Sequence, residues 1–441
     1  MSTFRLLKNI YEWINVSIQN LTESISNLDT TLLSDKMDQN PVLDRLESPK
    51  YFRSISKIGV IADIQYCDED DGKSFDGSET RRYRETLNVT KRAARSFEKH
   101  EVGAVLQLGD AIDGKSKSNF RRDFCERICP LLEMGCPESS LENAREHGTI
   151  PRLDVIGNHE LYCASRKELR ELLPCYGSKK DILCYSKVIA KGKWRLVILD
   201  SYAVSLLNGN RSELIDDPIP TGLEEAEDIL KANNPNILRQ PSDKYDWFKG
   251  LPTEKYRYVP YNGAIGKWQL DWLKNELKEA WDEKQFVVIF SHIPFSGKTT
   301  NPRSLHWDME DVLKVIKENG SHVIACIGGH RHSFKYQMSD EFDTDCHYVD
   351  IPSPLVAPVG GEAHAVFEFS VKHISIADKS LSPEFEAAKL HSDENLMYHS
   401  GKIYVKNERG KTMDDVGIIT IHGFGEMPNL LQLARIKPVE W

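Results

Sequence analysis

Six short apolar runs recur along the chain between residues 57 and 330. Polar residues do not alternate within them, and apolar runs of this length are typical of strands that are buried on both faces. We therefore predict a buried strand at each run. The runs are KIGVIAD (57–63), VGAVLQLGD (102–110), RLDVIGN (152–158), WRLVILD (194–200), FVVIFSH (286–292) and HVIACIGGH (322–330).

Longer segments with apolar residues at helical spacing lie between these runs. They predict helices over 78–99, 266–283 and 306–320, the first starting near residue 79. Strands and helices that alternate in this way indicate an α/β sheet covered by helices. The segments 363–378 and 416–425 predict two further strands.

Two internal regions interrupt this pattern. Residues 203–245 are acidic and predicted to form a loop-like insertion between a strand and a helix, and residues 377–412 are polar and charged. Residues 1–50 form a predicted N-terminal extension, in which an amphipathic helix is followed by a polar linker.

The N-terminal helix of this extension has apolar residues at helical spacing, namely Phe4, Leu6, Leu7, Ile10, Trp13, Ile14 and Ile18. We expect it to dock on the protein's own surface, with contact to a membrane or a partner as the alternative. No apolar stretch approaches the ~20 residues that a transmembrane helix requires. The N-terminus also lacks the continuous apolar core of a secretory signal.

Composition narrows the functional classes. The 441 residues are 40% hydrophobic and 28% charged, with a formal net charge of -10 and a pI near 5.8. This balance is typical of a soluble globular protein and argues against a nucleic-acid binder, which usually has a basic face. The nine cysteines are scattered, an arrangement that favours free thiols in a reducing compartment. We therefore predict a cytoplasmic protein.

Polar residues that bind metals stand at the ends of five predicted strands. Each has an ordinary explanation alone, such as a turn or a surface loop, but five coincidences at equivalent positions are improbable. The carboxyl ends of strands in an α/β sheet meet at one edge, where side chains converge. The residues are Asp63 and Gln65, Asp110, Asn158 to Glu160, His292, and His330 with His332.

The chemistry of this set favours a pair of metal ions. It combines imidazoles, carboxylates and amide oxygens without a thiolate, which suits Mn²⁺, Fe or Zn²⁺ more than Ca²⁺ or a structural zinc. Three imidazoles, two carboxylates and two amide oxygens give seven ligands, which exceed the need of one tetrahedral ion but fit two ions that share a carboxylate. Two ions ~3.5–4 Å apart stabilise the attacking and leaving oxygens of an in-line displacement. Hydrolysis of a phosphate ester or anhydride is the expected reaction.

The order Asp-x-Gln, Gly-Asp, Gly-Asn-His-Glu, His and Gly-His-x-His over residues 54–335 resembles the calcineurin-like metallophosphoesterase superfamily. The resemblance implies a four-layer α/β/β/α sandwich with two central sheets. It also implies two sets of metal ligands that share one carboxylate, and a histidine, His159, that stabilises the transition state or protonates the leaving oxygen. One ion would be held by Asp63, Gln65, Asp110 and His332, and the other by Asp110, Asn158, His292 and His330.

Gln65 stands where most members of the superfamily have histidine. Together with the segments 70–86, 261–277 and 304–313, it makes the chain similar to the manganese-dependent ADP-ribose/CDP-alcohol diphosphatases. An amide oxygen in this place is consistent with Mn²⁺. The ending VGIITIHGFGEMP implies a catalytic domain over 51–428, with insertions at 203–245 and 377–412, and a C-terminal tail over 429–441.

The resemblance implies a small-molecule substrate, the pyrophosphate of ADP-ribose or a CDP-alcohol, cleaved by in-line attack of a metal-bound hydroxide. Phe75 and Arg81 match an aromatic and a basic residue that contact the nucleotide, and a solvated helix start is the alternative for Arg81. Two other functions stay open: a phosphomonoesterase or cyclic nucleotide phosphodiesterase with the same metal pair, and a non-catalytic scaffold. Intact predicted ligands argue against the scaffold.

Overall fold

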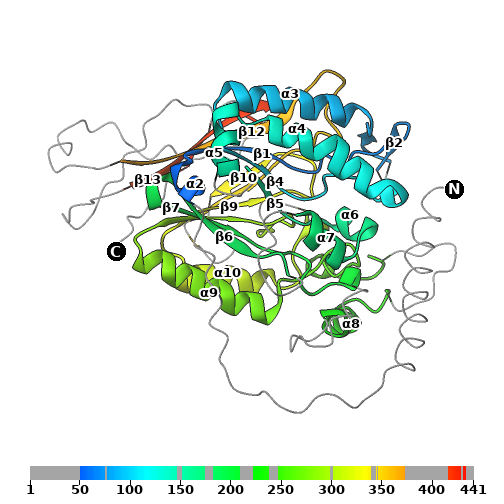
Figure 1. Cartoon of the computed structure of the whole chain (residues 1–441). Helices are drawn as coiled ribbons and strands as arrows, with labels where there is room; N and C mark the ends of the chain where they lie inside the picture. Colours follow the sequence, from blue (N-terminus) through cyan, green and yellow to red (C-terminus); the bar gives the residue numbers. More distant parts are fainter. Residues whose placement is uncertain are drawn as a thin grey trace, which may run out of the picture.

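The computed structural model describes residues 50–74, 77–146, 151–173, 182–208, 222–237, 247–297, 301–338, 344, 346–372, 416–428 and 431–433. Within this part of the chain, two six-stranded sheets lie face to face (Figure 1). The predicted N-terminal helix, Phe75 and the segment 377–412 lie outside the described residues.

The first sheet has the order β14-β13-β12-β1-β4-β5. Strands β1, β4 and β5 are parallel, and β12 joins β1 in an antiparallel pair. β14 extends this sheet beyond residue 428, where the sequence predicted the domain to end. The bounds are β1 Lys57–Ile61, β4 Ala104–Gln107, β5 Arg152–Asp154, β12 Ala363–Lys372, β13 Val416–Gly425 and β14 Leu431–Leu433.

The second sheet has the order β10-β11-β9-β8-β7-β6. Its four central strands are parallel, and the edge strands β10 and β6 are antiparallel to their neighbours. The six apolar runs correspond to β1, β4, β5, β7, β8 and β9, so these predicted strands are confirmed. The bounds are β6 Tyr185–Ile189, β7 Trp194–Ile198, β8 Phe286–Phe290, β9 Val323–Gly328, β10 Lys335–Met338 and β11 His347–Asp350.

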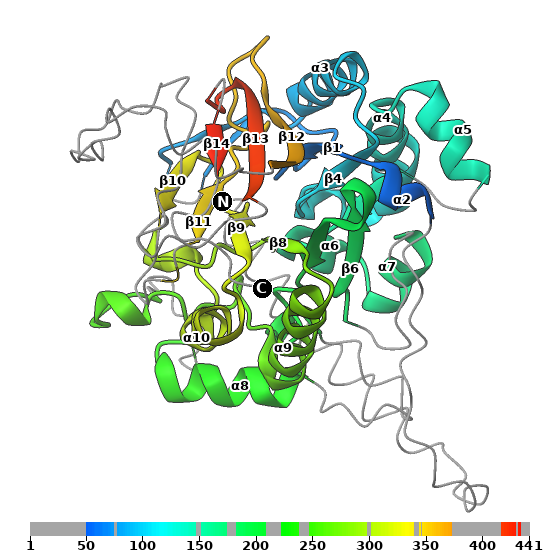
Figure 2. The ribbon, with the colours of Figure 1, turned by 90° about the vertical axis from the view of Figure 1, so that its left-hand side faces the viewer.

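Helices cover the outer faces of both sheets, as Figure 2 shows from the side. α3 and α4 pack on the first sheet through Phe97 and Leu132, and α9 and α10 pack on the second through Leu273 and Ile316. A third core, which includes Trp194, fills the space between the sheets. The predicted four-layer fold is therefore confirmed. The helices are α2 Lys50–Ser54, α3 Glu85–Lys99, α4 Cys129–Met134, α5 Glu138–Glu146, α6 Asn158–Cys163, α7 Arg166–Leu172, α8 Gly222–Asn233, α9 Gly266–Asp282 and α10 Met309–Asn319.

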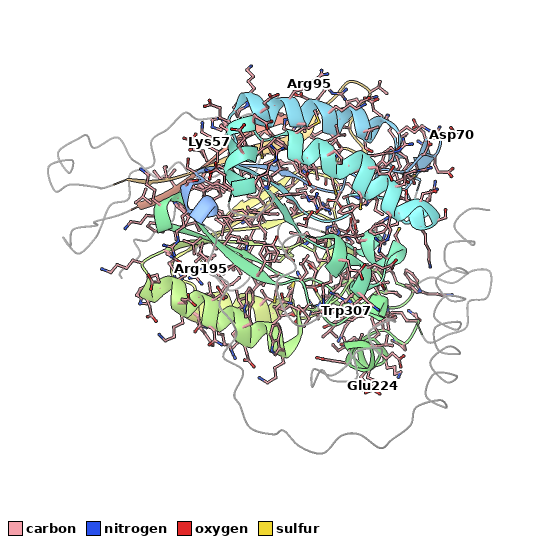
Figure 3. The ribbon with its side chains drawn as sticks, in the orientation of Figure 1. Lys57, Asp70, Arg95, Arg195, Glu224 and Trp307 are labelled. Atoms are coloured by element: carbon pink, nitrogen blue, oxygen red, sulfur yellow. The ribbon has the colours of Figure 1, made fainter. Side chains whose placement is uncertain are left out.

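Two predictions about secondary structure were wrong. The first long helix begins at Glu85, because Thr80–Arg81 forms strand β3, which pairs with β2 (Gly72–Lys73). The region 203–245 is also not all loop, since α8 lies within it. Ala226 and Leu230 of α8 pack against Trp307, which is labelled in Figure 3, and this apolar contact supports the helix despite its acidic surface.

The cysteines among the described residues are free thiols, in agreement with the scattered spacing in the sequence. Within the same residues, every helix is too short or too polar to cross a bilayer.

His364 of β12 is buried on the outer face of the first sheet. Its ring stacks on Phe424 at a centroid distance of 4.5 Å, and Phe97 of α3 meets it edge-on at 5.2 Å. Neither ring nitrogen forms a hydrogen bond with a described residue. Burial, together with the nearby His100, lowers the pKa of His364 to about 3. The folded protein therefore keeps this ring neutral.

We expect His364→Phe to make the protein less sensitive to acid. Below pH ~6.5 the unfolded chain binds a proton at His364 that the folded chain does not, so stability falls as pH falls. Between pH 6.5 and 5 the free energy of unfolding lost through His364 is about 2 kcal/mol. Urea unfolding at pH 7.5 and 5 should show a loss of stability smaller by about that amount in the variant. A pH dependence of His364→Phe identical to that of the wild type would contradict the prediction.

Candidate active site

All seven predicted metal ligands lie together at the carboxyl ends of strands from both sheets. Asp63 and Gln65 follow β1, Asp110 follows β4 and Asn158 begins α6 after β5, all from the first sheet. His292 follows β8, and His330 and His332 follow β9, from the second sheet. The site therefore lies where the edges of the two sheets meet.

Left-handed backbone conformations concentrate at this edge. The φ angles are 50° at Asp63, 45° at Gln65, 56° at Asp110, 65° at His330 and 69° at His332. Such angles are uncommon for residues with a Cβ and cost of order 1–3 kcal/mol each, so they are usually found at functional sites. The turns bend the chain sharply at each strand end, and this bending brings the side chains together.

One group of side chains surrounds Asp63. Its Oδ1 lies 3.6 Å from His332 Nε2, and Gln65 Nε2 lies 3.0 Å from the same nitrogen. Gln65 Nε2 also donates to Asp110 Oδ2 at 3.1 Å. The backbone N–H of His330 donates to Asp63 Oδ2 at 2.8 Å and fixes the carboxylate.

A second group lies on the other side of Asp110. His292 Nε2 is 3.4 Å from Asp110 Oδ2 and 3.1 Å from His330 Nδ1. The ligand atoms of Asp110, His292 and His330 all lie within 4.8 Å of one another, a separation suited to one metal ion. Asp110 therefore contacts both groups, and the two histidines of the His-x-His motif face different ones.

The amide of Asn158 adds an oxygen to this edge. Asn158 Oδ1 accepts a hydrogen bond from the Tyr202 hydroxyl at 3.0 Å, and the Tyr162 hydroxyl contacts the same amide. His292 is fixed by the carbonyl of Leu108 at 2.9 Å from its Nδ1.

Buried oxygen atoms without donors show that these residues fit a cation. Asp63 and Gln65 are 0% and 1% exposed, and within the described residues neither Asp63 Oδ1 nor Gln65 Oε1 receives a hydrogen bond. A buried acceptor without a partner is costly. A cation in contact with Asp63 Oδ1 and the neighbouring imidazoles would remove this cost for Asp63, and a rotated Gln65 amide would add its oxygen. The mixed oxygen and nitrogen set suits Mn²⁺.

Several ionisable groups here have shifted pKa values, as functional sites often do. Burial raises the pKa of Asp63. Burial and the charge of His292 lower the pKa of His330. Burial alone would lower the pKa of His292, but Asp110 outweighs it and raises the value to about 9.

His159 stands beside the predicted ligands rather than among them. In the neutral ring, the N–H of Gly114 donates to its Nδ1 at 2.8 Å, and the proton is then on Nε2. Nε2 lies 3.9 Å from Asp110 Oδ2, and Nδ1 lies 3.3 Å from Asp113 Oδ2. Burial would lower the pKa of His159, but the charges of Asp110 and Asp113 outweigh it and raise the pKa.

Glu160 is a structural part of the site for which no role was predicted from the sequence. Its carboxylate accepts the N–H groups of Asp110 and Gly157 at 2.8 Å each, and that of Ala111 at 2.6 Å. Burial and the charge of Asp110 raise the pKa of Glu160 to about 7, against these donors. Glu160 thereby joins the loops that carry Asp110 and Asn158.

We expect Glu160→Ala to destabilise the metal-free protein by about 3–5 kcal/mol, because three buried N–H groups lose their acceptor. Urea unfolding after EDTA treatment measures this loss. Glu138→Ala, at an exposed glutamate of α5, should change stability by less than about 0.5 kcal/mol. A loss as small for Glu160→Ala as for the control would refute this structural role.

Two further contacts of the site were not predicted from the sequence. Asn262 is 0% exposed, and its Oδ1 lies 3.0 Å from His330 Nε2, so it orients this ring with Nδ1 towards His292. Tyr202 contacts Asn158. Asn262 lies in the segment 261–277 that contributed to the resemblance, and Tyr202 follows the end of a predicted strand. Both residues therefore lie in regions that the sequence analysis singled out, but neither belongs to a motif that predicts a role in the site.

Of the two predicted substrate residues, Arg81 lies near the site. Its charge acts on both His159 and Asp113, and its guanidinium bonds the Tyr83 hydroxyl. Its Nε is buried and forms no hydrogen bond within the described residues. Because Arg81 belongs to β3, the alternative of a solvated helix start does not apply to it.

Known proteins resemble this chain in sequence and in fold. A sequence model of the calcineurin-like phosphoesterases matches residues 56–334. The manganese-dependent ADP-ribose/CDP-alcohol diphosphatase of Arabidopsis thaliana is 30% identical over 74% of this chain and 92% of its own length. The Homo sapiens protein of the same name is 28% identical over 68% and 83%. A dimetal phosphatase structure from Danio rerio shares the fold, with a TM-score of 0.60, 22% identity and coverage of 87% of this chain and 99% of its own.

Proposed function

Because this chain belongs to the calcineurin-like phosphoesterase family, we propose that it hydrolyses the pyrophosphate bond of nucleoside diphosphate conjugates such as ADP-ribose and CDP-alcohols. The observation that carries this proposal is the convergence of seven side chains with oxygen and nitrogen atoms at one edge, where buried acceptors lack donors among the described residues. The names of the relatives above supply the substrate class.

In this proposal the ligands form two sets that share Asp110. Asp63, Gln65 and His332 complete the first set, for which the Gln65 amide turns its oxygen inward. Asn158, His292 and His330 complete the second set. Two divalent ions, for which Mn²⁺ is the expected metal, would lower the pKa of a water and stabilise charge on the phosphoryl oxygens.

The chain's own residues then orient the reaction. Asp113 and Asp110 favour the charged ring of His159, which donates from Nδ1 to Asp113 and presents the proton on Nε2 towards the leaving oxygen. Arg81 offers a guanidinium for a phosphate oxygen of the substrate. Phe75, which lies outside the described residues, is proposed to stack on the base. Cytoplasmic residence and the absence of a nucleic-acid partner remain predictions from the sequence.

Initial rates on a panel of substrates test the proposal. The full chain is assayed with ADP-ribose, CDP-choline, a cyclic nucleotide and p-nitrophenyl phosphate, each with Mn²⁺, Mg²⁺ and Zn²⁺. Release of AMP and CMP that depends on Mn²⁺ is the expected result. Activity confined to the monoester or the cyclic substrate would replace the proposal with the phosphomonoesterase or phosphodiesterase alternative. If none of these substrates is hydrolysed, the non-catalytic scaffold is the remaining alternative.

A further inference from the structure

The end of β7 contributes none of the predicted ligands, although it lies beside the strand that carries His292. Asp200, Ser201 and Tyr202 follow β7, and all three are 0% exposed. The Tyr202 ring lies 6.1 Å from the ring of His292, and its hydroxyl donates to Asn158 Oδ1 at 3.0 Å. Tyr202 therefore contacts two members of the second ligand set.

A buried ion pair holds the backbone of Tyr202. Both Arg166 nitrogens Nη1 and Nη2 donate to the carboxylate of Asp200, and the two residues are 4% and 0% exposed. Asp200 Oδ1 accepts the N–H of Tyr202 at 2.9 Å, and Arg166 Nη2 donates to the Tyr202 carbonyl at 2.7 Å. Because both backbone polar groups are fixed, the position of the tyrosine ring is well defined.

This arrangement joins the two sheets at the site. Asn158 begins α6, after a strand of the first sheet, whereas Tyr202 follows β7 of the second. Arg166 lies on α7, shortly after Asn158 in the chain, and so the ion pair and the tyrosine hold the same segment at two points. Buried cross-links of this kind define geometry more than they add stability.

The hydrogen bond also determines how the Asn158 amide is turned. An amide oxygen has two lone pairs, and the Tyr202 hydroxyl occupies one of them. Tyr162 contacts the same amide. The two tyrosines thereby restrict the rotation of the amide, with Oδ1 turned towards the Tyr202 hydroxyl. Without Tyr202, the amide would rotate more freely.

We propose that Tyr202 is a positioning residue that orients Asn158 for the second metal ion. The inference rests on the proposed function, because it takes Asn158 as a ligand. Residues that orient metal ligands typically change metal affinity by about 10–100-fold when they are removed. Tyr202 would therefore set the affinity of one ion and leave the other unchanged.

The test is a Mn²⁺ titration of the EDTA-treated full chain, followed by electron paramagnetic resonance of free Mn²⁺. Tyr202→Phe keeps the ring and removes only the hydroxyl. We expect one of two binding steps to weaken by about 10-fold, with the other unchanged. Tyr348→Phe is the matched control, because Tyr348 is 1% exposed and its hydroxyl bonds Thr344 Oγ1 at 2.8 Å on a different part of the fold. Both steps should be unchanged in the control.

Three results would overturn the inference. If Tyr202→Phe binds both ions like the wild type, the tyrosine is an ordinary core residue. If both steps weaken equally, the effect is a general loss of stability. If the wild type binds no Mn²⁺, the proposed function fails as well. This failure can be told apart from a failure of the inference about Tyr202, because it is seen in the wild type before any variant is tested.

Discussion

We expect Asp110→Asn to lower kcat/KM for ADP-ribose by about 10³-fold or more with Mn²⁺ present. Asp110 contacts both ligand groups through its side chain, at 3.1 Å from Gln65 Nε2 and 3.4 Å from His292 Nε2. Asparagine keeps the size of the side chain but removes the negative charge that both cations would share. Release of AMP measures the effect.

Asp154→Asn is the control for Asp110→Asn. Asp154 is also buried at the end of a strand of the first sheet, but it pairs with Arg152 at 3.0 Å, outside the ligand groups. This variant should lose stability and keep its rate per folded molecule. If Asp110→Asn kept more than a tenth of the wild-type activity, Asp110 would not be the shared ligand.

The second large effect is expected at His159. His159→Asn should lower kcat for ADP-ribose by about 10²-fold or more, because the leaving oxygen loses its proton donor. The affinity for Mn²⁺ should stay unchanged, since His159 is not among the proposed ligands. Rate assays and the Mn²⁺ titration separate these two effects.

The choice of leaving group distinguishes the two roles proposed for His159. An alkyl ester of a nucleotide loses an alkoxide, which needs a proton much more than the phosphate that leaves ADP-ribose, so His159→Asn should slow its hydrolysis more than that of ADP-ribose. An equal loss on both substrates would indicate that His159 stabilises charge on the phosphoryl group instead. An unchanged rate on both would remove His159 from the mechanism.

The predicted ligands could be grouped from the sequence because they follow from one rule of topology. Buried parallel strands place their carboxyl ends at the same edge, and so Asp63, Asp110 and His292 could be grouped before their contacts were known. The strand β7 obeys the same rule. Its contribution was missed because Tyr202 acts through Asn158, and a tyrosine after a strand is usually a core residue.

The missed secondary structure has a different cause. The edge strands β6 and β10 are only partly apolar, and so their sequences lack the run that identified the central strands. The acidic helix α8 depends on a few apolar contacts with Trp307, which lies far along the chain. Asn262 reaches His330 from a loop, and no periodic pattern predicts which loop residue makes such a contact.

The pairing of β1 with β12 has a consequence for the way the chain folds during synthesis. About 300 residues separate the two strands, and a ribosome needs roughly 15–60 s to add them. During this time one edge of β1 lacks its partner, and an open strand edge of this kind pairs readily with other chains. The protein is therefore most prone to aggregate before its C-terminal third has emerged, and Asp63 and Gln65 are made early but fixed late.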